Sequence, residues 1–274
     1  MYNLAFTTLA CPEWTWQQVL DRAQEYGYQG VELRGVEGEM DLTRARPFTV
    51  ENLAATKQEL EERSLPIASV DTSCRLHDPD TEPNLAEARR HIDLAAELDC
   101  PWVRVFGDKI PEDEPRERII ERVVRGLMTL GEYAEGTGVG VLIESHGDFS
   151  RSDDLSETLR RAAHPQVGAL WDVHHPFRFY GEPVAQTFGK LRDHIRHTHL
   201  KDSQQASDGP RYCLVGEGDV PLDEVLGLLA ESGYDGWLSF EWEKKWHPEI
   251  DEPEVALPAY VRAIRRAELR LGIA

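Results

Sequence analysis

The chain has 274 residues and is 41% hydrophobic, which supplies enough apolar surface for one large α/β domain. Its formal net charge of −20 disfavours a nucleic-acid partner, because phosphate binding needs clustered Lys and Arg. No apolar run is long enough to span a bilayer, and the stretch from Met1 to Phe6 lacks a basic signal-peptide start. We therefore expect a cytoplasmic protein that binds neither nucleic acid nor membrane.

Short apolar runs alternate with stretches of helical periodicity along the whole chain. The predicted strands are Leu4–Leu9, Val31–Leu33, Pro66–Asp71, Trp102–Phe106, Val141–Glu144, Ala169–Asp172, Ile195–His199 and Trp237–Glu241. The predicted helices are Trp14–Tyr26, Glu51–Arg63, Leu85–Leu98, Arg116–Ala134, Asp154–Ala163, Pro183–Leu191, Leu222–Glu231 and Glu254–Leu271. Eight strand–helix pairs predict a (β/α)₈ TIM barrel, with residues 1–274 as one α/β domain. A doubly wound sheet is the alternative, but no glycine-rich nucleotide loop is present.

The last four predicted strands all end in a residue that can bind a divalent metal. These residues are Glu144, Asp172, His199 and Glu241. The C-terminal ends of barrel strands form one mouth, so the four side chains are expected to converge there. Three carboxylates and one imidazole suit Mn²⁺, Mg²⁺ or Co²⁺, with Zn²⁺ as a further candidate. Four unrelated polar strand ends, paired or solvated, are the alternative interpretation.

Further candidates lie close to these four residues in the sequence. Lys201 lies two residues after His199, so strand alternation points both side chains the same way, and Asp202 is its alternative partner. His146 has the same relation to Glu144, and either His174 or His175 faces the site. The candidate substrate contacts are His146, His175, Lys201, His77 and Arg178. The four cysteines form no CxxC pair and are expected to be free thiols.

At these positions the sequence resembles the xylose-isomerase-like TIM-barrel superfamily of sugar isomerases and epimerases. The matching segments run from Val141 through His146, from Trp171 through His175, from His197 through Asp202 and from Gly216 through Asp219, and the run before Glu241 also matches. The resemblance implies one divalent ion, commonly Mn²⁺, held by Glu144, Asp172, His199 and Glu241. It also implies that Glu144 and Glu241 act as acid/base groups, and that relatives form dimers or tetramers.

The implied reaction starts from a small sugar or keto-sugar whose carbonyl is polarised by the metal. A glutamate removes the neighbouring proton to give an enediolate, and return of a proton gives isomerisation or epimerisation. A lyase of inosose or dehydroshikimate dehydratase type shares this first step, and a non-catalytic sugar-binding barrel is a third hypothesis. Gln205, Ser150 and Arg151 depart from the ketose 3-epimerase pattern, which speaks against a free-ketose 3-epimerase.

Overall fold

The structure is a computed structural model that describes residues 1–207 and 209–273. Eight parallel strands form a nearly closed barrel in the order β1-β10-β7-β6-β5-β4-β3-β2, which confirms the predicted (β/α)₈ fold class. The chain divides into two compact units, and we describe each by itself. Unit 1 contains Met1–Ala68 and His199–Ala274, and unit 2 contains Ser69–Thr198.

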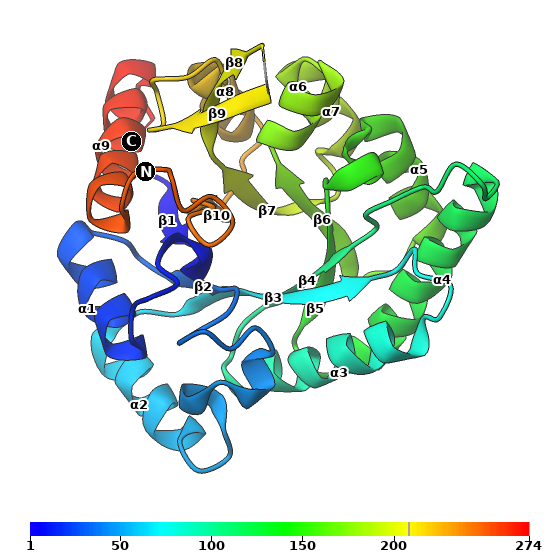
Figure 1. Ribbon diagram of the computed structural model, residues 1–274, viewed down its shortest axis with the longest axis horizontal. Coiled ribbons are helices and arrows are strands. Elements are labelled where there is room, and N and C mark those ends of the chain that lie inside the picture. Colours follow the sequence, from blue (N-terminus) through cyan, green and yellow to red (C-terminus); the bar gives the residue numbers. More distant parts are fainter. Residues whose placement is uncertain (208, 274) are drawn as a thin grey trace. The chain divides into compact units, whose positions relative to one another are not determined.

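In unit 1 the start of the chain lies beside the last helix, α9 (Pro253–Leu271) (Figure 1). The backbone N–H of Tyr2 donates to the Glu268 carboxylate of α9 at 2.6 Å and fixes the first strand there. The elements of unit 1 are β1 (Asn3–Phe6), α1 (Trp16–Tyr26), β2 (Val31–Leu33), α2 (Leu53–Arg63), β8 (Asp202–Ala206), β9 (Gly209–Cys213), α8 (Leu222–Glu231), β10 (Trp237–Phe240) and α9 (Pro253–Leu271). Three 3-10 turns, Thr8–Ala10, Leu42–Arg44 and Arg46–Phe48, follow β1 and β2.

Unit 2 contains most of strand β3 (Ile67–Arg75) and the first residues of β7 (Ile195–Leu200), so the two strands continue into unit 1. Its other elements are α3 (Glu82–Glu97), β4 (Trp102–Phe106), α4 (Arg116–Ala134), β5 (Gly140–Glu144), α5 (Ser152–Ala162), β6 (Val167–Asp172), α6 (His174–Tyr180) and α7 (Val184–Leu191). A 3-10 turn, Gly147–Ser150, joins β5 to α5. The helices pack against their neighbours in chain order, α3 on α4 and α4 on α5.

The strands carry apolar residues on both faces because parallel barrel strands are buried on both sides. Every residue of β5 is buried. The register pairs Phe106 of β4 with Glu144 of β5, and Glu144 with Leu170 of β6. In unit 1, Phe6 of β1 pairs with Phe240 of β10, so Glu241 is the first residue after its strand. The register therefore places the candidate acids at or just beyond the strand ends.

Local signals account for the helix boundaries. Thr15 and Gln18 form a reciprocal capping box at the start of α1, and Gly27 ends that helix at a φ of 85°. Helix α3 begins three residues earlier than expected, at Glu82, because Pro83 fits the first turn of a helix. The predicted first strand is too long, since β1 ends at Phe6 and residues 8–10 form a 3-10 turn capped by Thr7.

Two elements were not expected from the sequence. His174 and His175 are the first two residues of the short helix α6, and the antiparallel hairpin β8–β9 follows β7. The cysteine prediction is confirmed, since Cys11, Cys74 and Cys100 are buried free thiols and Cys213 is half-buried. Within the described ranges, no helix has the length and apolar character needed to cross a membrane.

Candidate active site

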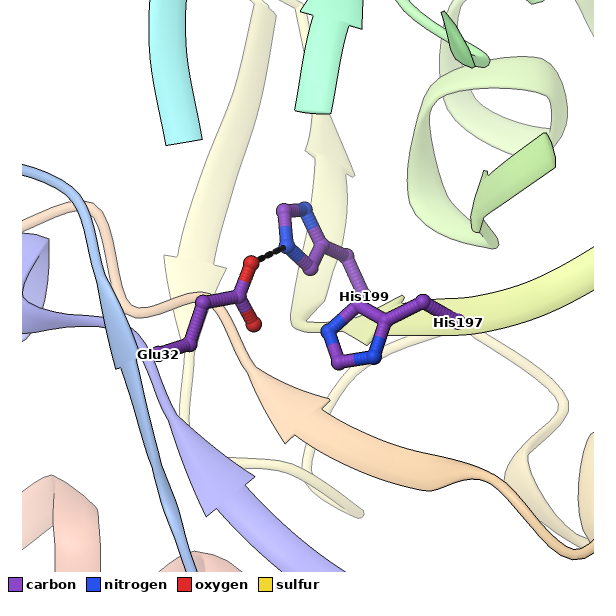
Figure 2. Close-up of side chains that lie close together, drawn as sticks. All are labelled: Glu32, His197 and His199. Carbon is purple, nitrogen blue, oxygen red and sulfur yellow. Dashed lines mark hydrogen bonds and ion pairs between the residues drawn. The ribbon is translucent and has the colours of Figure 1, made fainter. Parts of the chain in front are cut away.

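Glu32 and His199 form a fully buried acid–imidazole pair in unit 1. Glu32 is the middle residue of β2, and its Oε1 lies 2.6 Å from Nε2 of His199, with both side chains fully buried (Figure 2). His197 precedes His199 by two residues on β7 and is also buried. Because an ionised carboxylate only accepts hydrogen bonds, Nε2 of His199 is the donor in this contact.

The other nitrogen of His199 faces Glu241. Its Nδ1 lies 3.4 Å from Oε1 of Glu241, whose backbone N–H donates to the Leu200 carbonyl at 3.1 Å. Either a proton on Nδ1 or a cation between Nδ1 and the carboxylate satisfies this contact. A carboxylate–histidine–metal arrangement has this pattern, with Glu32 in the outer position. The donor set of unit 1 therefore fits a divalent cation.

A buried lysine holds the Glu241 carboxylate. The Lys201 ammonium contacts Oε2 of Glu241 and lies 2.9 Å from Oε1 of Glu243, and the Lys201 side chain is fully buried. Burial alone raises the pKa of Glu241, but the Lys201 ammonium and the His199 ring outweigh burial and hold that pKa well below its usual range. Glu241 is therefore ionised at neutral pH.

Asp202, the expected alternative partner of Lys201, instead binds backbone N–H groups. Its carboxylate accepts from the backbone N–H groups of Gly216, Gly218 and Val220 at 2.9, 3.0 and 3.2 Å, and from that of Ser203 at 2.8 Å. A Cβ on Gly218 would lie 2.1 Å from Asp202 Oδ1, so only glycine allows this approach. The predicted Gly216–Asp219 motif is thus a loop that is folded around the Asp202 carboxylate.

In unit 2, Glu144 belongs to a buried chain of charges. In the Arg104 guanidinium, Nε lies 3.2 Å from Oε2 of Glu144, and Nη2 lies 3.2 Å from Oδ2 of Asp71. The guanidinium also donates to the Thr72 carbonyl at 3.0 Å and stacks over Phe106 at 3.9 Å from the ring centre. One buried cation thus contacts two buried carboxylates.

Asp172 ends strand β6, two residues before helix α6 begins. Its Oδ1 accepts from the backbone N–H groups of His174 and His175 at 2.8 and 3.0 Å, and its Oδ2 lies 3.5 Å from Nε2 of His175. The Ser145 hydroxyl fixes the Asp172 backbone through both its N–H and its carbonyl, at 2.8 and 3.0 Å. This framework holds the fully buried carboxylate in one orientation.

His146 and His175 lie together in unit 2. Their ring centres are 4.8 Å apart, and the His146 ring is 4.6 Å from that of Phe106. Nδ1 of His146 lies 3.2 Å from Oδ1 of Asp108, a half-buried residue with a left-handed φ of 60°. Burial lowers the pKa of His146, but the hydrogen bond to Asp108 and the charge of Glu144 outweigh it, so that pKa is raised. Burial raises the pKa of Asp108, but the hydrogen bond from His146 and the charge of that ring outweigh this effect, so the Asp108 pKa is lowered.

The remaining two candidates also lie in unit 2. His77 is buried, with Nε2 at 3.2 Å from Asp78, and its carbonyl accepts from Arg122. Arg178 lies on α6, and its guanidinium is 5.4 Å from the centre of the Phe177 ring. Of the six candidates in unit 2, the structure therefore brings together His146 with His175, His175 with Asp172, and Asp172 with Glu144, whose carboxylate oxygens lie within 4.8 Å of each other.

Sequence reasoning missed four charged residues, which are Glu32, Asp71, Arg104 and Asp108. The first three lie inside strands β2, β3 and β4, where a charged side chain is costly unless it has a partner. Their charge inside apolar runs was the signal that could have found them. Asp108 gave no such signal, because it lies in a polar loop and only the fold places it beside His146.

A model of the xylose isomerase-like TIM barrel family matches residues 20–266 of the chain. The chain belongs to the xylose isomerase-like TIM barrel family. A member of known structure, from Mycobacterium smegmatis and in complex with magnesium, is 17% identical and superposes with a TM-score of 0.76 over 99% of this chain and 98% of that chain. At this identity the likeness shows the fold alone.

Two curated relatives carry names of different reactions. A fructoselysine 3-epimerase of Shigella flexneri is 29% identical over 155 residues, which is 55% of this chain and 55% of that protein. This chain thus covers only about half the length of that epimerase. An inosose dehydratase of Bacillus anthracis is 28% identical over 238 residues, 76% of this chain and 79% of that protein. Relatives in the xylose isomerase-like TIM barrel family thus include an epimerase and a dehydratase.

Proposed function

We propose that the protein is a divalent-metal-dependent isomerase or epimerase of a small sugar or keto-sugar, acting by proton abstraction next to a carbonyl. The observation that carries this proposal is Glu241, a buried carboxylate kept ionised by Lys201 beside His199. A buried, ionised carboxylate at a barrel strand end has the properties of a general base. The fructoselysine 3-epimerase relative supports a reaction of this kind.

The proposed metal ligands are Glu144, Asp172, His199 and Glu241. All four side chains are buried, and their oxygen-rich chemistry with one imidazole suits Mn²⁺ first, and Mg²⁺, Co²⁺ or Zn²⁺ next. Nδ1 of His199 and Oε1 of Glu241, which lie 3.4 Å apart, support a cation at that position. When bound, such an ion acts as a Lewis acid that polarises a carbonyl and acidifies the neighbouring C–H.

Protein side chains would carry out the proton transfers and bind the substrate. Glu241 is ionised and would accept the proton, while Lys201 and Glu243 fix its carboxylate. Glu144, held by Arg104, would return a proton to the other carbon or to the opposite face. His146 and His175 would bind substrate hydroxyl groups, because their rings lie together and only part of each is exposed. Lys201 already contacts two carboxylates and would act on the substrate through Glu241.

A lyase of inosose or dehydroshikimate dehydratase type is the second candidate. The inosose dehydratase relative favours it, because that match extends over 238 residues. The first step would be the same removal of a proton by Glu241, but a β-hydroxyl would then leave. His146, with its raised pKa, would be the group that protonates this leaving hydroxyl.

The test is to incubate Mn²⁺-loaded protein with ketoses and with inosose in D₂O and to follow the C–H signals by proton NMR. Exchange of the C–H next to the carbonyl without loss of water supports the isomerase or epimerase, and an enone absorbance supports the lyase. The Glu241→Gln and Glu144→Gln variants should lose the exchange and retain the fold. If substrates bind but neither exchange nor enone forms in the wild type, the protein is a sugar-binding barrel and the proposal is wrong.

A further inference from the structure

A cavity of unit 1 lies between helix α9 and the loop that follows strand β9, and we call it the α9 cavity. Its volume is about 330 Å³, which is within the range of small-molecule sites in proteins. None of the four proposed metal ligands lines it, so it is separate from the candidate active site. Its charged wall consists of three exposed arginines of α9, which are Arg262, Arg266 and Arg270.

The spacing of these arginines directs them to one face of α9. Helical residues four apart are neighbours on the surface, so the three guanidinium groups form a single row. Ala259 and Ala263 lie on the same face and also line the cavity. Their small side chains leave room beside the row of positive charge.

Only one of the three arginines has an acidic partner among residues 1–207 and 209–273. The Arg270 guanidinium binds both carboxylate oxygens of Asp223 on α8. Arg262 and Arg266 make no ion pair within 4 Å. Both also lie more than one turn before the helix end at Leu271, so the helix dipole does not account for them. Like charges at this spacing destabilise a helix, and an anion between the two would remove the repulsion.

The α9 cavity has an excess of positive charge, although the protein carries a net charge of −20. Besides the three arginines, Glu217 is its one charged lining residue, and within the described part of the chain its carboxylate makes no ion pair. The Glu217 backbone is fixed, because its N–H donates to the Leu214 carbonyl at 3.0 Å and its carbonyl accepts from Gln204 at 2.7 Å. Two guanidinium groups without an ion pair thus outnumber one carboxylate.

The chemistry of the α9 cavity matches a phosphate ester. A phosphate monoester carries a charge of about −1.5 to −2 at pH 7 and offers three acceptor oxygens. Two guanidinium groups can therefore donate to it at once, whereas a single carboxylate is matched by one. The remaining lining residues include Leu214, Val215 and Leu222, which supply an apolar surface for the organic part of an ester.

We propose that the α9 cavity binds the phosphate group of a phosphorylated small molecule, with Arg262 and Arg266 as its ligands. Such a molecule would join α9 to the loop whose Gly216 N–H donates to Asp202 at 2.9 Å. It would thereby restrict the movement of residues 214–217. This inference does not depend on the proposed reaction, because it uses none of the residues assigned to that reaction.

The test is titration calorimetry of the full chain with D-glucose 6-phosphate, inorganic phosphate and citrate. We expect both phosphates to bind, and the ester to bind more tightly because its carbon skeleton packs on the apolar residues. Arg262→Met combined with Arg266→Met should raise both dissociation constants at least about ten-fold. Arg118→Met combined with Arg125→Met removes two exposed arginines of α4 and is the matched charge control, which should change neither constant.

Hydrogen exchange of the backbone amides locates the bound ester. Exchange measured by mass spectrometry should slow at residues 214–217 when D-glucose 6-phosphate is present, and this slowing should be lost in the α9 double variant. The unfolding midpoint of that variant without ligand should equal that of the wild type, because both replaced side chains are exposed.

The remaining outcomes would overturn the inference or one part of it. If neither phosphate binds the wild type, or if the α9 double variant binds both as tightly, the α9 cavity is not a phosphate site. Tighter binding of citrate than of either phosphate overturns the choice of phosphate, and tighter binding of inorganic phosphate than of the ester overturns the choice of an ester. Phosphate binding that depends on Arg262 and Arg266 supports the site even if no sugar exchanges its C–H in D₂O, in which case only the proposed function fails.

Discussion

The carboxylate of Glu32 on β2 lies 2.6 Å from Nε2 of His199 on β7, and both side chains are fully buried. The two nitrogens of the imidazole thus have different partners. Nε2 contacts Glu32, and Nδ1 faces Glu241 at 3.4 Å. A proposed metal ligand therefore has its orientation and its protonation fixed by a residue 167 positions away in the chain.

The first prediction follows from this contact and from the proposed metal. Glu32→Gln keeps the size of the side chain, but its amide can no longer fix the Nε2 proton of His199 as a carboxylate does. We expect the dissociation constant for Mn²⁺ to rise by about 10- to 100-fold, as is typical for loss of an outer-shell carboxylate. Isothermal titration calorimetry of the metal-free protein with Mn²⁺ measures this dissociation constant, and Glu59→Gln on the outer helix α2 is the control. An unchanged constant would show that Glu32 does not act on the metal.

The second prediction concerns the buried ammonium of Lys201. Lys201→Met leaves the buried Glu241 carboxylate and the half-buried Glu243 carboxylate without their shared cation, and we expect a loss of about 3–5 kcal/mol in the free energy of unfolding. The Glu241 pKa should rise, because Lys201 is the largest of the effects that lower it. The acidic limb of the pH–rate profile should then move to higher pH.

A double variant separates this charge effect from simple loss of packing. Lys201→Met combined with Glu243→Gln removes the charge of one of the two carboxylates and should recover part of the lost stability, as measured by urea denaturation. If the double variant is no more stable than Lys201→Met alone, the loss comes from packing and the electrostatic explanation is wrong.

The third prediction concerns pH and the pair of Asp108 and His146. The pKa of His146 is raised in the folded protein, so the pair stabilises the fold below the ordinary His pKa of about 6.5, and this contribution is lost as pH rises through the raised value. Asp108 has a lowered pKa and remains charged across that range. In metal-free protein, Asp108→Asn should therefore destabilise the fold more at pH about 5.5 than at pH about 8.5.

The direct measurement is an NMR titration of the His146 ring in the metal-free protein. Its midpoint should lie above about 6.5 in the wild type and should fall in Asp108→Asn, because burial lowers the pKa once the carboxylate charge is removed. The same midpoint in both proteins would show that Asp108 does not control the protonation of His146.

The fourth prediction concerns the loop around Asp202. Asp202→Ala leaves the N–H groups of Gly216, Gly218 and Val220 without their acceptor, and we expect a loss of about 3 kcal/mol in the free energy of unfolding. Gly218→Ala should also be destabilising, since its Cβ would lie 2.1 Å from the Asp202 carboxylate. Chemical denaturation measures the free energy of unfolding of both variants. The control is Glu61→Ala on the exposed face of α2, whose free energy of unfolding should change by no more than about 0.5 kcal/mol. A stable Asp202→Ala variant would show that the loop folds without this carboxylate.

The sequence by itself determined the fold class and the position of the candidate ligands along the chain. Apolar runs alternating with helical periodicity predict eight strand–helix pairs because strands and helices bury side chains with different periods. The same pattern places Glu144 and Asp172 at strand ends, and the register of β4, β5 and β6 agrees with that placement. Local pattern is sufficient for these features, since each depends on residues that are close in the chain.

Only the tertiary structure decided the partner of each charged side chain. Lys201 contacts Glu241 and Glu243, which are about 40 residues away, and the neighbouring Asp202 binds backbone N–H groups instead. Asp108 reaches His146 across 38 positions, and Glu32 reaches His199 across 167. An ion pair depends on distance in space, and a one-dimensional pattern contains no information on which loops the barrel brings into contact. The residues that tune Glu241, His146 and His199 therefore became visible only in the folded chain.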